Sequence, residues 1–306
     1  MNVGVGMDIK WVSFTDIGLQ RKENEDSIYS YKKDNCAVFI VADGMGGYEN
    51  GKNASDTIVR YVAKYIELDM DKIIAAKKQF DKVYDQNTFF DDIKNVLLNA
   101  NKDIFENYTA KGHSSGSTLI MIAIYENVYN IFWAGDSHIY QVIDDDLVAL
   151  TVDDVWENDK EAIKNLTKEQ VINDKNYGRL TNAFGTIENV NIHMMNGFIK
   201  QGMKFLLCSD GVYKYCDKKV LNEIITNKKK NENQEEFKEE IKDKDKTVKI
   251  DNNNNDIKEK NNTKENSKQI EEDNKTHREK LPKLVKEEVY KNGAIDNLSF
   301  IYVEIN

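Results

Sequence analysis

Three consecutive apolar runs, each of strand length, lie between residues 118 and 143 and constrain the fold more than any other feature. The runs are rich in β-branched and aromatic residues and are bounded by Gly, Asp or Asn, which is typical of strands; they are Thr118–Tyr125, Val128–Ala134 and His138–Ile143. Strands that follow one another without an intervening helix indicate antiparallel sheets rather than a parallel, doubly wound fold.

Further strands and several helices are expected on either side of this group. The other strand-like runs are Asp8–Phe14, Ser27–Tyr31, Cys36–Ala42, Met203–Cys208 and Leu298–Glu304. Apolar residues at helical spacing predict helices over Ala54–Leu68, Phe89–Tyr108, Asp217–Ile225 and Leu281–Lys291. The pattern predicts an α+β protein in which helices cover antiparallel sheets.

Residues 226–280 differ in composition from the rest of the chain. They hold fifteen basic residues, fifteen acidic residues and eleven Asn, with six clearly apolar positions. Such a segment buries too little apolar surface to offset the entropy lost on ordering, so we predict a disordered, low-complexity insertion. A solvated charged helix is the alternative, because Glu and Lys recur there at helical spacing. A single folded domain is expected to comprise 1–225 and 281–306.

Charge and composition exclude several classes of protein. The 43 Lys and Arg against 53 Asp and Glu give a net charge of −10, and an acidic body lacks the positive field that binding to nucleic acid requires. The sequence has no run of eighteen apolar residues, so no membrane span is predicted. The first residues lack the pattern of a signal peptide. Three scattered cysteines suit neither a disulfide framework nor a zinc site. We expect a cytoplasmic protein with neither a membrane nor a nucleic-acid partner.

Several apolar runs end or begin at an aspartate. Asp43, Asp136 and Asp210 each follow such a run and precede Gly or Ser, and Asp296 opens the last run. Turn chemistry accounts for any one of them, since Asp-Gly commonly ends a strand. Taken together, they are consistent with carboxylates that meet at one rim of a sheet and repel one another unless cations lie between them. Oxygen ligands suit Mg²⁺ or Mn²⁺, and two such ions can activate water and hold a phosphate.

A charged segment near the N-terminus supplies a second group of polar side chains. Glu25 and Asp26 are adjacent and follow Arg21 by four and five residues. A guanidinium beside metal-binding carboxylates is the arrangement that phosphate recognition requires, because it offers a bidentate donor next to the ions. Taken alone, the segment is better explained as a solvated charged loop.

Seven motifs occur in a fixed order along nearly the whole chain outside 226–280. They are Thr15-Asp-x-Gly-x-x-Arg21-x-x-Asn-Glu25-Asp26, Val41-Ala-Asp43-Gly-Met-Gly-Gly47, Gly116-Ser-Thr-Leu119, Ala134-Gly-Asp136-Ser-His-Ile-Tyr140, Leu180-Thr-Asn-Ala-Phe-Gly185, Cys208-Ser-Asp210-Gly211 and Gly293-Ala-Ile-Asp296-Asn297. In this order they resemble the metal-dependent protein phosphatases, the PPM or type 2C family, in its bacterial-style branch. The resemblance implies a central β-sandwich of two antiparallel sheets flanked by helices, the αββα arrangement.

The resemblance also implies two bound Mn²⁺ or Mg²⁺ ions, with a possible third. Asp43 would bridge the two ions, and the carbonyl of Gly44 would reach one of them. The remaining carboxylates would complete the metal sites: Asp210 and Asp296 at one ion, Glu25 and Asp26 at the other, and Asp136 with Asp210 at a third.

Two further roles follow from the same resemblance. Arg21 would bind the phosphate, and Asn297 would support Asp296. Residues 152–178 match no motif of the family, and we expect substrate preference to depend on them.

The resemblance implies a protein-serine/threonine phosphatase, a phosphoric monoester hydrolase. It would act in signalling on phosphorylated proteins, which the resemblance implies are substrates of a Ser/Thr kinase. The alternative is an inactive member of the fold that serves as a binding or regulatory module, although Asp43, Asp210 and Asp296 are all present. A nucleotide hydrolase is a third possibility, because residues 46–53 nearly match a phosphate-binding loop, but no Ser or Thr follows Lys52.

Overall fold

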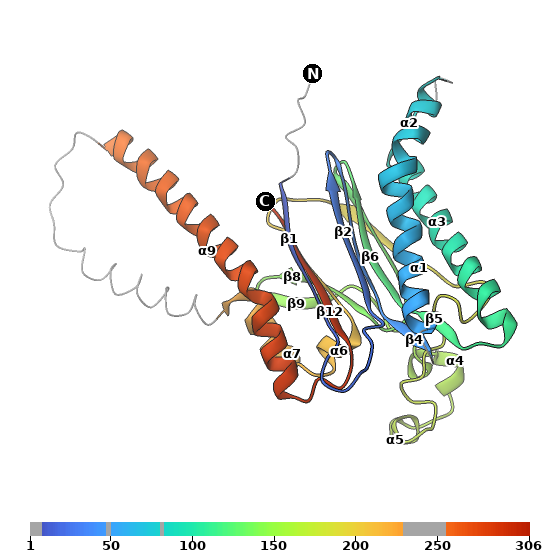
Figure 1. Cartoon of the computed structure of the whole chain (residues 1–306). Helices are drawn as coiled ribbons and strands as arrows, with labels where there is room; N and C mark the ends of the chain where they lie inside the picture. The colour runs from blue at the N-terminus through green and yellow to red at the C-terminus, as the bar shows by residue number, and fades with distance from the viewer. Residues whose placement is uncertain (1–7, 47–49, 80–82, 229–254) are drawn as a thin grey trace.

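Two antiparallel sheets of five strands lie face to face in the computed structural model, which describes residues 8–46, 50–79, 83–228 and 255–306 (Figure 1). The first sheet has the order β1-β12-β11-β8-β9, with strands at Ile9–Asp16, Leu298–Ile305, Lys204–Cys208, His138–Ile143 and Asp146–Ala149. The second has the order β10-β7-β6-β3-β2, with strands at His193–Phe198, Val128–Ala134, Leu119–Tyr125, Cys36–Ala42 and Ser27–Lys33. The predicted α+β sandwich is confirmed.

The central strand β3 shows why an uninterrupted apolar run folds as a strand here. All seven of its residues are buried. Val38 and Ile40 face the layer of helices, whereas Phe39 and Val41 face the other sheet. Because both faces of the strand are covered, apolar residues occupy every position instead of alternating with polar ones.

Helices cover the outer face of each sheet (Figure 1). The second sheet is covered by α1 (Asn50–Lys64), which continues through a π-helical turn (Tyr65–Asp69) into α2 (Met70–Gln79), and by α3 (Gln86–Asn107). The first sheet is covered by α6 (Asp210–Tyr213), α7 (Lys218–Thr226) and α9 (Asn255–Lys291). Smaller elements complete the fold: the ladder of β4 (Gly44–Gly46) with β5 (Ser115–Ser117), the 3-10 turns Thr109–Lys111 and Trp156–Asn158, and the helices α4 (Lys160–Ile163) and α5 (Lys168–Ile172).

The outermost ends of β1 and β12 lie side by side. The two strands pair antiparallel from Ile9 opposite Ile305 to Asp16 opposite Leu298. Beyond the ladder, the backbone N–H of Asn306 donates a hydrogen bond of 2.8 Å to the carbonyl oxygen of Asp8.

Helix α9 differs from the sequence-based expectation. Disorder was predicted over 226–280, but residues 255–280 belong to α9, so the helical alternative describes this part; residues 229–254 lie outside the described residues. The predicted helix Leu281–Lys291 is the C-terminal part of α9, and Leu281, Val285 and Val289 are fully buried in the core. This anchored end supplies a helix nucleus that the charged part extends, at a lower cost than starting a new helix. The division into one domain and one insertion stays a prediction.

A buried ion pair fixes the middle of α9 to the first sheet. Arg278 pairs with Glu304 of β12, and both side chains are largely buried. Glu304 also accepts a hydrogen bond of 3.1 Å from the hydroxyl of Tyr302 and lies 3.6 Å from the ammonium of Lys204. Composition alone gave no sign of this contact, because Arg278 stands among residues that look uniformly solvated.

We expect Arg278→Met to lower the free energy of unfolding by about 3 kcal/mol, because it leaves the buried carboxylate of Glu304 with only its weaker partners. The melting temperature should fall by roughly 6–10 °C. Lys275→Met is the matched control, since Lys275 lies one turn earlier on α9 and its ion pair with Glu279 is exposed. Equal melting temperatures for the two variants would contradict the anchoring role of Arg278.

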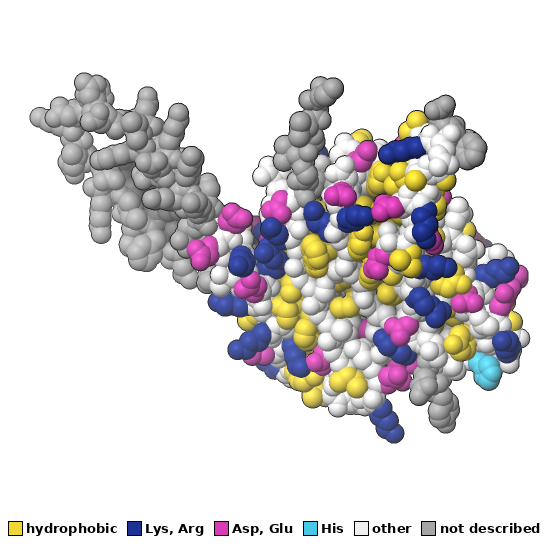
Figure 2. Space-filling view, turned by 45° about the horizontal axis from the view of Figure 1, so that its top comes forward, with side chains coloured by type: hydrophobic (Ala, Val, Ile, Leu, Met, Phe, Trp, Pro, Cys, Tyr) yellow, Lys and Arg dark blue, Asp and Glu magenta, His cyan; other side chains and the backbone are white. Residues whose placement is uncertain are grey.

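The charges on the visible surface are mixed in sign. Figure 2 shows Lys and Arg side chains interspersed with Asp and Glu over the face that is drawn. That face therefore carries no continuous basic stripe of the kind that tracks a nucleic-acid backbone. None of the helices among the described residues is long and apolar enough to cross a membrane.

Candidate active site

A cavity of about 930 Å³ opens at one end of the β-sandwich and gathers most of the predicted site residues. The predicted residues that line it are Arg21, Glu25, Asp43, Gly44, Asp136, Asp210 and Asp296. Asp26 and Asn297 are buried. Asn297 accepts a hydrogen bond from the backbone N–H of Glu25, and Asp26 accepts one from the hydroxyl of Ser209, the residue before Asp210. The structure thus brings together carboxylates that lie up to 271 residues apart, from Glu25 to Asp296.

The strand order explains why these carboxylates meet. Asp43 follows the end of β3, Asp136 follows the end of β7, and Asp210 follows the end of β11. Asp296 precedes the start of β12, which runs antiparallel to β11. These strand ends all lie at the same end of the sandwich, so the four carboxylates line one cavity.

Burial and mutual repulsion disfavour the charged forms of these carboxylates. Burial, followed by the charges of Asp26, Asp210, Asp136 and Asp296, raises the pKa of Asp43 well above its usual range. Burial raises the pKa of Asp26 to about 6, although hydrogen bonds from Ser299 and Ser209 oppose the shift. The pKa values of Asp136 and Glu25 are also raised, again chiefly by burial. Together these shifts show that the buried carboxylates are not fully balanced by the charges around them.

Two side-chain cations partly balance this charge. Arg21 lies 2.7 Å from Asp296, between its Nη2 and the Oδ2 of the carboxylate. Lys214 lies 2.7 Å from Asp210, between its Nζ and Oδ2, and 3.3 Å from Oδ2 of Asp136. Among the described residues, no three Asp, Glu, His or Cys side chains are already gathered closely enough to form a metal site.

Unsatisfied oxygen atoms show that the donor set still fits divalent cations. Oδ1 of Asp26 and Oδ1 of Asp210 are buried, and neither has a hydrogen-bond partner among the described residues. An orphaned carboxylate oxygen in a buried site is costly unless a cation contacts it. Oxygen donors of this kind suit Mg²⁺ and Mn²⁺.

Asn297 holds the loop between β1 and β2 against the start of β12. Its Nδ2 donates hydrogen bonds to the carbonyl oxygens of Ile17 (2.9 Å) and Glu23 (3.0 Å), and its Oδ1 accepts one of 2.9 Å from the backbone N–H of Glu25. Its own N–H donates to Oδ1 of Asp296 at 2.8 Å. One buried amide thus fixes the relative positions of Glu25 and Asp296.

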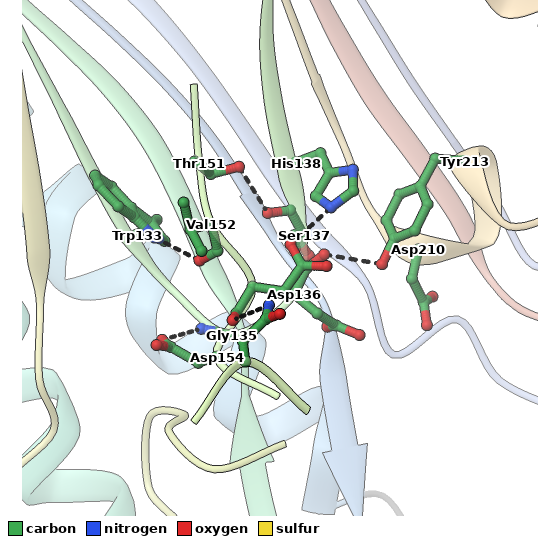
Figure 3. Close-up of polar contacts among 12 residues, drawn as sticks. Trp133, Gly135, Asp136, Ser137, His138, Thr151, Val152, Asp154, Asp210 and Tyr213 are labelled. Carbon is green, nitrogen blue, oxygen red and sulfur yellow. Dashed lines mark hydrogen bonds and ion pairs between the residues drawn. The ribbon is translucent and has the colours of Figure 1, made fainter. Parts of the chain in front are cut away.

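The turn that carries Asp136 is tied to the segment after β9 (Figure 3). The N–H of Gly135 donates to Oδ2 of Asp154 at 3.0 Å, and Nε1 of Trp133 donates to the carbonyl oxygen of Val152 at 3.1 Å. Asp154 also accepts a hydrogen bond of 2.7 Å from Asn182. These contacts position the segment 152–182 beside the cavity.

Several lining residues were not predicted from the sequence. Trp156 and Asn176 line the cavity from residues 152–178, which matched no motif, and Arg179 directly follows that region; no local pattern distinguished them. Lys214 could have been found, because it follows Asp210 by four residues, a spacing that brings side chains together on a helix.

The raised pKa of Asp26 makes a prediction about stability. A group whose pKa is higher in the folded protein than in the unfolded chain stabilises the fold below about pH 4 and loses that contribution as the pH rises through about 6. We therefore expect Asp26→Asn, in EDTA at pH 8, to raise the free energy of unfolding by about 2–3 kcal/mol. Thermal denaturation of both proteins from pH 4 to pH 8 tests this. A difference that does not grow with pH contradicts it.

Comparisons with known proteins agree with this geometry. The family model for protein phosphatase 2C matches residues 20–244. A serine/threonine phosphatase of Listeria innocua, named stp, is 26% identical over 216 residues, which span 70% of this chain and 82% of that protein. A protein of Mycoplasma genitalium assigned as a protein phosphatase is 29% identical over 218 residues, which span 69% of this chain and 81% of that protein.

Solved structures share the fold. The serine/threonine phosphatase Stp1 of Staphylococcus aureus has a TM-score of 0.67 at 18% identity. The match covers all of this chain and 98% of the Stp1 chain. The catalytic domain of the phosphatase PstP, solved with two manganese ions, has a TM-score of 0.64 at 18% identity and covers 98% of this chain and 99% of its own. At this level of identity the likeness shows the fold.

Proposed function

We propose, from the premise that this chain belongs to the protein phosphatase 2C family, that it hydrolyses phosphoserine and phosphothreonine in proteins with divalent metal ions bound in the acidic cavity. The chain is a protein serine/threonine phosphatase by its family and its relatives. The observation that carries the metal-dependent mechanism is the convergence of five carboxylates on one cavity that also holds an arginine.

The residues that would hold the ions are those that the resemblance named. Asp43 and the carbonyl of Gly44, with Asp210 and Asp296, would hold one Mn²⁺ or Mg²⁺, and Glu25 and Asp26 would complete the set for a second. The orphaned oxygens of Asp26 and Asp210 support this assignment. When bound, such ions activate water for attack on phosphorus and neutralise charge on the phosphoryl oxygens.

The protein's own residues would bind and orient the phosphate. Arg21 lies at the cavity with its side chain about half exposed, so its guanidinium is accessible to a phosphoryl group. A guanidinium can offer two parallel N–H donors to two phosphoryl oxygens, which orients the group as well as binding it.

The cysteines do not offer an alternative nucleophile. All three are buried. Burial raises the pKa of Cys36 and of Cys216 to about 12, and Cys208 shifts in the same direction. Since the thiolate is the reactive form of cysteine, direct attack by water is the favoured route.

Two other functions are less well supported. A binding module without activity would be expected to lack one of the metal-ligating aspartates, but Asp43, Asp210 and Asp296 all line the cavity. Lys52, in the near match to a nucleotide-binding loop, is already bound within the protein: its ammonium donates to the carbonyl oxygen of Asp26 (2.9 Å) and to Oγ of Ser27 (3.1 Å).

We propose that the partners of this chain are cytoplasmic proteins phosphorylated by a Ser/Thr kinase.

Hydrolysis of a phosphothreonine peptide, with Mn²⁺ and with EDTA, tests the proposal. Release of phosphate that requires Mn²⁺ is the expected result. A folded protein that binds Mn²⁺ but releases no phosphate would favour the binding module. Release of phosphate that persists in EDTA would contradict metal dependence.

A further inference from the structure

Lys214 contacts two site carboxylates from different parts of the chain. It follows α6, and its backbone N–H donates to the carbonyl oxygen of Asp210 at 2.9 Å, which completes one helical turn. Its ammonium lies between Asp210 and Asp136, at 2.7 Å and 3.3 Å. An ordinary helix-surface pair would join Lys214 to Asp210 alone and contribute little; the second contact, to a turn 78 residues away in sequence, makes this lysine a cross-link.

The residue before Lys214 holds the same turn from another side. The hydroxyl of Tyr213 donates a hydrogen bond of 2.9 Å to the carbonyl oxygen of Asp136 (Figure 3). The ring of Tyr213 stacks on His138 at 3.9 Å between centroids, and the ammonium of Lys214 lies 5.9 Å from the same ring. Tyr213 and Lys214 therefore place α6 against both the backbone and the side chain of Asp136.

The pair of carboxylates needs a cation. Asp136 is buried, and its carboxylate shares the ammonium of Lys214 with the carboxylate of Asp210. Lys214 supplies a single positive charge at contact distance from each. Because this charge is covalently tethered and already in place, it does not depend on the concentration of free metal. A divalent ion between the same two oxygens would have to displace the ammonium and overcome its repulsion.

We propose that Lys214 is the fixed cation that joins Asp136 to Asp210 and takes the place of a divalent ion between them. The inference rests on the proposed metal-dependent function and refines it. Divalent ions are then confined to the part of the cavity formed by Asp43, Glu25, Asp26, Asp296 and the Oδ1 side of Asp210. Lys214 is a positioning residue, because it acts on the site through these two carboxylates.

Counting bound Mn²⁺ by isothermal titration calorimetry tests the proposal. Lys214→Met removes the charge and keeps most of the length of the side chain, so this variant is expected to bind one more Mn²⁺ per chain than the wild type. Lys214→Arg should bind the wild-type number. Lys218→Met, which removes an exposed charge at the start of α7, is the matched control and should also bind the wild-type number. Equal numbers for Lys214→Met and the wild type would overturn the proposal.

A second pair of variants keeps the test decisive if Lys214→Met folds poorly. Asp136→Asn alone should leave the number of bound Mn²⁺ unchanged, because the pair holds no ion while Lys214 is present. In the Lys214→Met background, the same substitution should abolish the additional ion. Loss of one Mn²⁺ from the single Asp136→Asn variant would show that a divalent ion occupies the pair in the wild type, and would overturn the proposal.

The outcome can be separated from a failure of the proposed function. Phosphopeptide hydrolysis by the wild type with Mn²⁺ is measured in parallel. If the wild type binds no Mn²⁺ and releases no phosphate, the metal-dependent function fails. A Lys214→Met variant that gains an ion would still support the role of the lysine, and one that gains none would overturn it.

Discussion

Asp43→Asn is expected to lower phosphatase turnover by about a thousandfold or more while the protein stays folded. Asp43 lines the acidic cavity, and four other carboxylates contribute to its raised pKa. Asparagine keeps the size of the side chain but removes the charge that would attract the ions. Initial rates with a phosphothreonine peptide at saturating Mn²⁺ measure the effect.

The same substitution should increase stability in the absence of metal. Because ionised Asp43 is buried among like charges, its removal relieves repulsion, and the melting temperature in EDTA at pH 8 should rise. The control is Asp91→Asn, an exposed position on α3 that does not line the cavity; it should change neither property. A variant of Asp43 that keeps wild-type turnover would contradict the assignment of this residue to the metal centre.

Gly211→Ala is expected to lower the free energy of unfolding by about 3 kcal/mol or more. A Cβ at this position would lie 1.9 Å from the carbonyl oxygen of Asn297 and 2.8 Å from its carbon. Both partners are backbone atoms, so either α6 or the loop before β12 must move. The movement would separate Asp210 from Asp296, and a displacement of about 1 Å in a catalytic site can lower the rate about a hundredfold.

Gly202→Ala is the control for adding a methyl group to the backbone, because Gly202 does not line the cavity. No atom lies within 4 Å of the added Cβ, and only the positive φ of +86° opposes the substitution. That strain costs about 1 kcal/mol. Chemical denaturation and peptide hydrolysis of both variants measure the difference. Similar losses in the two variants would show that the close approach at Gly211 is not what restricts this position to glycine.

Strands made of apolar, β-branched and aromatic runs were predictable from sequence, and short or mostly exposed edge strands were not. Val128–Ala134 and His138–Ile143 were predicted with the bounds that β7 and β8 show. Strand β10 escaped prediction: it lies at a sheet edge, most of its residues are exposed, and its pairing with β7 holds it in place. Strand β9 is four residues long with one buried side chain, too short for a pattern.

The site was predictable where sequence motifs carry the chemistry. Asp43, Asp136, Asp210 and Asp296 each stand at a strand end, and antiparallel pairing brings such ends together. Contacts that depend on distant segments were not predictable. Asp154 follows β9 of the first sheet and Gly135 follows β7 of the second, so their contact depends on how the two sheets pack. Arg278 meets Glu304 only because α9 lies along the first sheet. The role of the site aspartates as metal ligands, and that of Arg21 as a phosphate binder, stay predictions.

The pairing of β1 with β12 gives the chain a nearly circular path. Asp8 and Asn306 are hydrogen-bonded neighbours, so a short linker between them would close the chain, which could then be opened at a connection between Asp210 and Asp296. A chain permuted in this way would carry the aspartate motif at 296 first and the one at 210 last, with the same cavity. The linear order of motifs is therefore a property of where the circle is cut, whereas the spatial arrangement of the carboxylates belongs to the sandwich itself.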